Sequence, residues 1–94
     1  MRAAVYDRPG PAREVLRIET RPDPAPGPGE VLVRVAASGV NPSDVKTRAA
    51  WMKTPRDFPL TVPHSDGAGV IEAVGAGVDP ARLGERVWLW NAQW

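Results

Sequence analysis

Alternating apolar and polar positions indicate short β-strands along most of the chain. The clearest pattern covers residues 30–37, where Val31, Val33, Val35 and Ala37 share one face of an extended segment. Leu32, Arg34 and Ala36 share the other face. The same kind of pattern, in shorter or less regular form, predicts further strands at residues 2–6, 15–20, 66–75 and 85–90.

Proline and glycine separate these strands. The chain has 11 prolines and 9 glycines, spread over several turns, and this distribution argues against long helices. Pro22, Pro24, Pro26 and Pro28 occupy every second position, which predicts a stiff, exposed, extended connection. Residues 51–63 are predicted to form a loop, and residues 79–84 a turn.

One short helix is predicted directly after the clearest strand. Asn41 and Ser43 are both suitable N-cap residues, and Pro42 fits the first helical turn. The helix is expected to end near residues 48–50. The whole pattern predicts a mainly β domain with one or two short helices.

Length, charge and composition narrow the class of protein. The 94 residues fit one small domain, and a formal charge of +1 without a run of Lys or Arg gives no argument for a nucleic-acid partner. The absence of cysteine excludes disulfides and thiolate metal sites. No apolar run suits a signal peptide or a membrane span, so we expect a cytoplasmic protein that binds no membrane.

The stretch of residues 63–75 contains the densest candidate chemistry. The lone histidine, His64, precedes Ser65 and Asp66, and Gly67 and Gly69 follow where a backbone must bend or come close to another group. The glycine spacing does not match a dinucleotide-binding loop. One histidine beside one aspartate is too few ligands for a metal.

Three residues each allow a structural and a functional interpretation. Asn41 either caps the predicted helix or turns its amide toward a ligand, for which it offers both a donor and an acceptor. His64 is either a loop histidine bonded to backbone or solvent, or part of a pocket wall. Trp51 either packs in a core or interface, or forms a flat wall for a ligand.

Several motifs together resemble the medium-chain dehydrogenase/reductase superfamily. They are the run VLVRVAASGVNPSD at residues 31–44, residues 63–77, the sequence Gly84-Glu85-Arg86-Val87 and the proline-rich lead-in to Glu30. The resemblance implies a GroES-like, partly open β-barrel. It also implies that residues 1–94 form the N-terminal part of a catalytic domain, with a Rossmann NADPH-binding domain outside this chain.

The resemblance is to the zinc-independent quinone oxidoreductases, the ζ-crystallin-like branch. Zinc alcohol dehydrogenases of the superfamily carry Cys where this chain has Asn41, and His-Glu where it has Ser65-Asp66. The branch implies NADPH as cofactor, no zinc, and hydride transfer to a quinone or an α,β-unsaturated carbonyl. Two departures from the branch are Lys46, where many members have Tyr, and His64, where Gly is usual.

The site residues expected on this basis fall into three overlapping groups. The catalytic group is Asn41, Lys46 and His64; the cofactor-binding group is Asn41, Asp44 and Ser65; and the substrate-pocket group is Trp51 and His64. The full-length protein is expected to be a homodimer. The fragment alone is expected to be inactive and to associate through an exposed sheet edge.

Two other functions remain open on the sequence. One is an enoyl or polyketide-type reductase of the same superfamily, which differs only in its substrate. The other is a free-standing GroES-like binding or structural domain such as a co-chaperonin, because a shared fold does not fix function.

Overall fold

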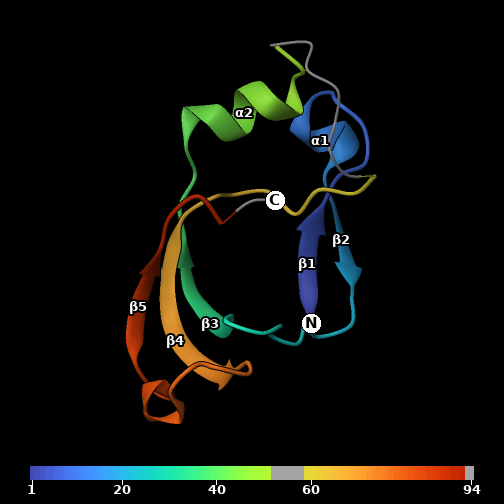
Figure 1. The fold of residues 1–94 in the computed structure, drawn as a ribbon. Coiled ribbons are helices and arrows are strands. Elements are labelled where there is room, and N and C mark those ends of the chain that lie inside the picture. The colour runs from blue at the N-terminus through green and yellow to red at the C-terminus, as the bar shows by residue number, and fades with distance from the viewer. Residues whose placement is uncertain (52–58, 93–94) are drawn as a thin grey trace.

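The computed structural model describes residues 1–51 and 59–92. Its elements are β1 (Arg2–Val5), α1 (Ala12–Val15), β2 (Arg17–Thr20), β3 (Val31–Ser38), α2 (Pro42–Arg48), β4 (Gly67–Val74), the 3₁₀ turn η1 (Pro80–Arg82) and β5 (Arg86–Leu89). The strands form two antiparallel sheets, β1-β2 and β3-β4-β5 (Figure 1). Within the described residues these sheets do not close into a barrel, so the mainly β, partly open architecture is confirmed.

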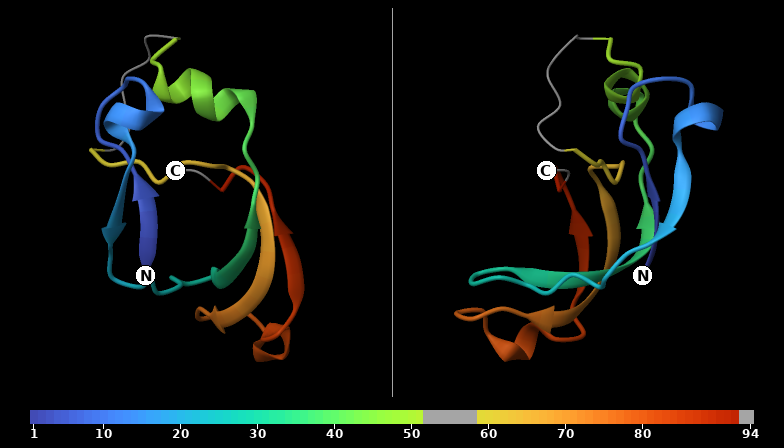
Figure 2. Two further views of the ribbon diagram at one scale, coloured as in Figure 1. Left: turned by 180° about the vertical axis from the view of Figure 1, so that it is seen from behind. Right: turned by 90° about the vertical axis from the view of Figure 1, so that its right-hand side faces the viewer.

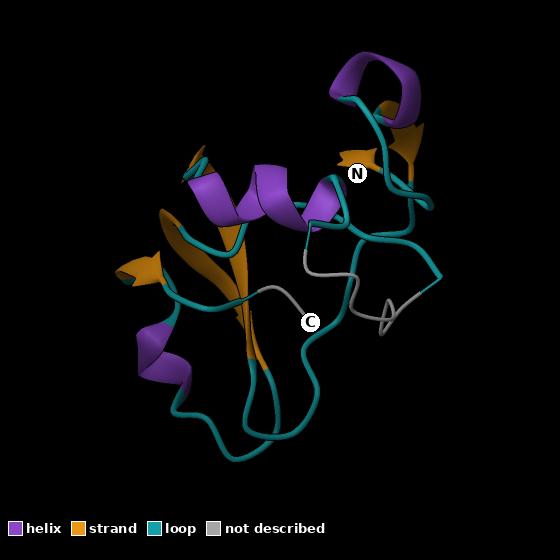
Figure 3. Cartoon of the chain, turned by 90° about the horizontal axis from the view of Figure 1, so that it is seen from above, coloured by secondary structure: helices purple, strands orange, loops and turns teal. Residues whose placement is uncertain are grey.

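The two sheets lie on opposite sides of the molecule, and helix α2 crosses between them at one end (Figure 1). The view from behind in Figure 2 shows the same arrangement. Seen from above in Figure 3, α2 extends from the end of β3 toward α1. Hydrogen bonds fix that contact, since Gly10 N–H donates to the Arg48 carbonyl and the Arg48 guanidinium donates to the Gly10 carbonyl.

Strands β3 and β4 pair from Val31↔Val74 to Ser38↔Gly67, but their register is not continuous. It shifts between Leu32 and Val33 and again between Val35 and Ala37. Such bulges bend and twist a sheet. The strict alternation of faces predicted for residues 30–37 is therefore wrong at the second shift, where Ala36 is the extra residue on β3, although the strand itself is confirmed.

The buried apolar core of the described residues is small. It consists of Val5, Tyr6, Val15 and Ile71. Tyr6 continues β1 by exchanging backbone hydrogen bonds with Thr61, which the predicted loop at residues 51–63 did not anticipate. Residues 52–58 of that loop lie outside the described residues.

Residues 15–20 were expected to form one strand, and this prediction is wrong at its start. Val15 ends the one-turn helix α1, and β2 begins at Arg17. Pro11 directly precedes α1, and its fixed φ of −60° suits a chain that enters a helical turn. The turn brings Val15 into the core, where its side chain lies against Gly10.

Three tryptophans of the described residues are largely exposed. Trp51 is 67%, Trp88 75% and Trp90 77% accessible, so packing in a core does not explain them in this chain. Trp94, the remaining tryptophan, lies outside the described residues. In the described part of the chain, none of the helices has the length and apolar character that crossing a membrane requires.

Gly69 tests how closely β3 and β4 approach each other. A Cβ at this position would overlap the Arg34 carbonyl oxygen on β3, so Gly69→Ala is expected to destabilise the chain by about 1–3 kcal/mol. The measurement is the free energy of unfolding in urea. Gly77→Ala is the matched control: its φ is +83° but no atom lies within 4 Å of the new Cβ, so only about 1 kcal/mol is expected. Equal losses in both variants would contradict the close approach.

Candidate functional site

Two segments that are distant in sequence run side by side where β3 ends and β4 begins. Three hydrogen bonds join them: Ser38 Oγ to His64 Nδ1 at 2.6 Å, Gly39 N–H to the Asp66 carbonyl at 2.9 Å, and Asn41 Nδ2–H to Asp66 Oδ2 at 2.9 Å. We call residues 38–41, 44 and 64–66 the Asn41 corner. The corner brings together Asn41, Asp44, His64 and Ser65, four of the residues predicted from the sequence.

Asn41 is the N-cap of α2, as one of its two interpretations predicted. Its backbone is extended, with φ −117° and ψ 158°, and Pro42 follows at the first helical position. Its N–H donates to Asp44 Oδ2 at 2.7 Å, which completes a capping box. Asp44 is only 8% exposed, and its charge also lies favourably at the positive end of the helix dipole.

The Asn41 side chain has a second anchor outside the helix. Its amide nitrogen donates one hydrogen to Asp66, which leaves the second N–H of the amide for another acceptor. The amide is thus fixed in orientation by a charged partner. Capping and ligand binding are therefore compatible roles for Asn41.

Asp66 fits closely against Gly39. Its Oδ2 bonds Asn41, whereas its Oδ1 is buried without a hydrogen-bond partner among the described residues. A Cβ on Gly39 would overlap this Oδ1, so only glycine leaves room for the carboxylate there. Asp66 and Gly39 were absent from the predicted site residues. The sequence did contain one signal for Asp66, because an acidic residue directly precedes a strand that begins with glycine.

His64 has an unusual backbone conformation. Its φ is +79°, in the left-handed region that favours glycine and that histidine tolerates better than most side chains. This explains why glycine would be the ordinary residue at such a position. The side chain, in turn, pairs with Ser38, a residue that sequence reasoning missed because the two are 26 positions apart.

The structure does not bring Lys46 and Trp51 into the corner; they form a pair of their own, on helix α2 and just after it. The Lys46 ammonium lies 4.9 Å from the centre of the Trp51 ring, a cation–π distance, and the backbone N–H of Trp51 donates to the Lys46 carbonyl. Ser65 has a backbone role, since its carbonyl accepts a hydrogen bond from Ala92 N–H at 2.8 Å. The segment after β5 is thereby held against the corner.

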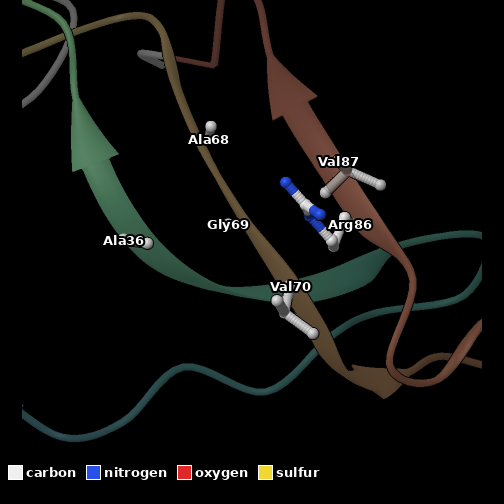
Figure 4. A pocket seen from close by; sticks show the side chains of 6 residues that line it. All are labelled: Ala36, Ala68, Gly69, Val70, Arg86 and Val87. Atoms are coloured by element: carbon white, nitrogen blue, oxygen red, sulfur yellow. The ribbon is translucent and has the colours of Figure 1, made fainter.

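A shallow hollow of about 360 Å³ lies farther along the sheet (Figure 4). Its lining is largely apolar, with one charged side chain, and consists of Ala36, Ala68, Gly69, Val70, Arg86 and Val87. None of the predicted site residues lines it. The corner, rather than this hollow, holds the polar groups suited to chemistry.

Among the described residues, the groups whose pKa is shifted from its ordinary value belong to exposed ion pairs outside the corner. A hydrogen bond from Arg17 lowers the pKa of Asp7, and a hydrogen bond from Arg82 lowers the pKa of Glu85. Both carboxylates are exposed at the surface, so these pairs stabilise the fold little.

A double-mutant cycle on Asn41→Ala and Asp66→Ala tests the anchor. We expect each single change to destabilise the chain and the pair to show a coupling free energy of about 1–3 kcal/mol, because the bond is partly buried and charge-assisted. Urea unfolding of the four proteins measures it. Asp66→Asn keeps an acceptor and should lose less than Asp66→Ala. Additive losses would show that the two side chains do not interact.

Comparison with known proteins identifies the family to which the chain belongs. Residues 27–93 match the model of the alcohol dehydrogenase GroES-like domain. The synaptic vesicle membrane protein VAT-1 homolog of Rattus norvegicus is 41% identical over 78 residues, which are 81% of this chain and 19% of that protein. The quinone oxidoreductase of Rattus norvegicus is 40% identical over 88 residues, 93% of this chain and 26% of that protein.

Solved structures agree with the fold. A mycobacterial protein complexed with NADPH superimposes with a TM-score of 0.81 at 36% identity, over 98% of this chain and 29% of that chain. A cobalt- and zinc-bound thermostable alcohol dehydrogenase from Pyrobaculum aerophilum gives a TM-score of 0.81 at 40% identity, over 94% of this chain and 25% of that chain. The chain therefore belongs to the alcohol dehydrogenase GroES-like domain family, within the medium-chain dehydrogenase/reductase superfamily.

Proposed function

We propose that this chain is the N-terminal catalytic-domain part of an NADPH-dependent, zinc-independent reductase that acts on a quinone or an α,β-unsaturated carbonyl. The observation that carries the proposal is the set of hydrogen-bonding side chains in the corner: the Asn41 amide anchored by the Asp66 carboxylate, and the Ser38 hydroxyl paired with the His64 ring. Such groups suit hydrogen bonding to an organic ligand. The likeness to a quinone oxidoreductase and to a protein complexed with NADPH supports the same assignment.

Zinc does not fit this donor set. Protein zinc sites use thiolate, imidazole and carboxylate ligands, usually three or four together. The described residues contain no cluster of three His, Cys, Asp or Glu side chains able to hold a metal. The Asn41 amide nitrogen donates a hydrogen bond to the Asp66 carboxylate, and an amide nitrogen with its hydrogens is not a zinc ligand. The residues at this corner thus differ in chemistry from a zinc site, although a zinc-bound neighbour shares the fold.

The corner has the parts needed to position a reduction. NADPH, when bound, supplies the hydride, and the protein orients the reactants and excludes water. In this proposal the remaining Asn41 N–H bonds the cofactor or the substrate oxygen, while Asp44 and Ser65 contribute to cofactor binding. Lys46 and His64 supply donors toward the oxygen that gains negative charge, and Trp51 forms a wall of the substrate pocket.

Asn41 is tested in the full-length enzyme that this proposal implies. Asn41→Ala is expected to lower kcat for NADPH oxidation with a quinone by about tenfold or more, because an oriented donor is lost. Stopped-flow absorbance of NADPH gives the rate constant for reduction. Thr47→Ala removes an exposed polar side chain from the same helix and is the control. An unchanged rate and KM in Asn41→Ala would remove Asn41 from the mechanism.

Metal content provides an independent test. The purified full-length protein should contain no stoichiometric zinc at this corner, and prolonged treatment with a strong chelator should leave its quinone reductase activity unchanged. Elemental analysis and a parallel activity assay measure both quantities. Loss of activity on chelation, restored by added zinc, would overturn the zinc-independent assignment.

A further inference from the structure

The Ser38–His64 pair is the feature of the corner with the least structural explanation. The Ser38 hydroxyl lies 2.6 Å from His64 Nδ1, a short hydrogen bond. His64 holds its ring there from a left-handed backbone at φ +79°. A non-glycine residue in that conformation is strained, and such strain concentrates at functional sites.

The Ser38–His64 pair lies in the same corner as the Asn41–Asp66 bond, and the proposed function assigns the reaction to this corner. Ser38 comes three residues before Asn41, and His64 two residues before Asp66, while Asn41 and Asp66 are bonded to each other. Both hydrogen bonds therefore cross-link the same two segments. Ser38 is exposed and His64 is half-buried, so the hydroxyl is the more accessible member of the pair.

We propose that Ser38 and His64 form a two-residue proton relay for this corner. The inference rests on the proposed function, because reduction of a conjugated carbonyl by hydride needs a proton as well. Hydride adds to carbon, and the carbonyl π electrons move onto oxygen. The proposed step starts with His64 as an imidazolium that carries a proton on both ring nitrogens. The Ser38 O–H proton passes to the substrate oxygen, and the His64 Nδ1–H proton passes to Ser38 Oγ. The neutral imidazole that remains then takes up a proton from solvent.

The relay assigns each group a task that its chemistry suits. A serine hydroxyl both donates and accepts, so it can pass a proton without changing its own charge. Imidazole is the side chain best matched to proton transfer near neutral pH. Because hydroxyl and ring are in contact, the two residues act as one unit. Removing either is expected to have nearly the same effect as removing both.

The test uses substitutions at His64 that suit its backbone. His64→Gly relieves the positive φ, so the full-length variant should fold as well as the parent. His64→Asn tolerates the same φ and still hydrogen-bonds, yet it cannot deliver a proton. We expect both variants to lower kcat for quinone reduction by about 10²-fold or more. Added imidazole should restore activity to His64→Gly.

Ser38→Ala should match His64→Gly, and the double variant should be no slower than either. Thr20→Ala, which removes an exposed hydroxyl from the other sheet, is the matched control and should keep the parent rate. Full activity in His64→Asn would show that the pair is structural and would overturn the relay. Failure of imidazole to rescue His64→Gly would also count against it.

The experiment separates this proposal from the one on which it rests. If the parent protein does not oxidise NADPH with any quinone or enone, the proposed function fails and the relay fails with it. If the parent is active and the His64 and Ser38 variants are equally active, the relay alone is wrong. A solvent deuterium isotope effect that is present in the parent and reduced in the slow variants would support proton transfer through the pair.

Discussion

Strands β3 and β4 can pair over their length only because glycine lies where one backbone comes directly against the other. A side chain at Gly67 would meet the Ala37 carbonyl, one at Gly69 the Arg34 carbonyl, and one at Gly75 the Gly27 carbonyl. The rest of the larger sheet depends on this pairing, since β4 is the one described strand with which β5 pairs. This close approach also fixes how the segments beyond the strand ends meet, and the Asn41 corner forms there.

In the corner, a glycine again makes room for a neighbouring group, which here is a side chain. Gly39 leaves room for the Asp66 carboxylate, and this carboxylate holds the Asn41 amide. Asn41 in turn starts α2, with Asp44 completing the cap. A single carboxylate thus couples the start of a strand to the start of a helix. Of the two Asp66 carboxylate oxygens, Oδ2 bonds Asn41, whereas Oδ1 is buried without a hydrogen-bond partner among residues 1–51 and 59–92.

Local signals predicted most of the fold. Period-two patterns located four of the five strands of the described residues to within one residue at each end, and Asn41-Pro42 located the start of α2, because these signals depend on neighbours in sequence. Val15 was misassigned to a strand because its apolar side chain fits a buried strand and a buried helical turn equally well. The register shifts between β3 and β4 were missed because the extra residue of a bulge depends on how the two strands pair.

The sequence by itself determined that this chain is a small, cysteine-free, mainly β domain with a polar turn at Asn41 and another at His64 and Asp66. It contained the motifs of the superfamily to which the chain belongs. Only the tertiary structure decided which polar groups meet. The bonds from Asn41 to Asp66 and from Ser38 to His64 span 25 and 26 positions, so no local pattern encodes them. These bonds form because β3 and β4 pair closely at their glycines, and this pairing brings residues 38–41 beside residues 64–66.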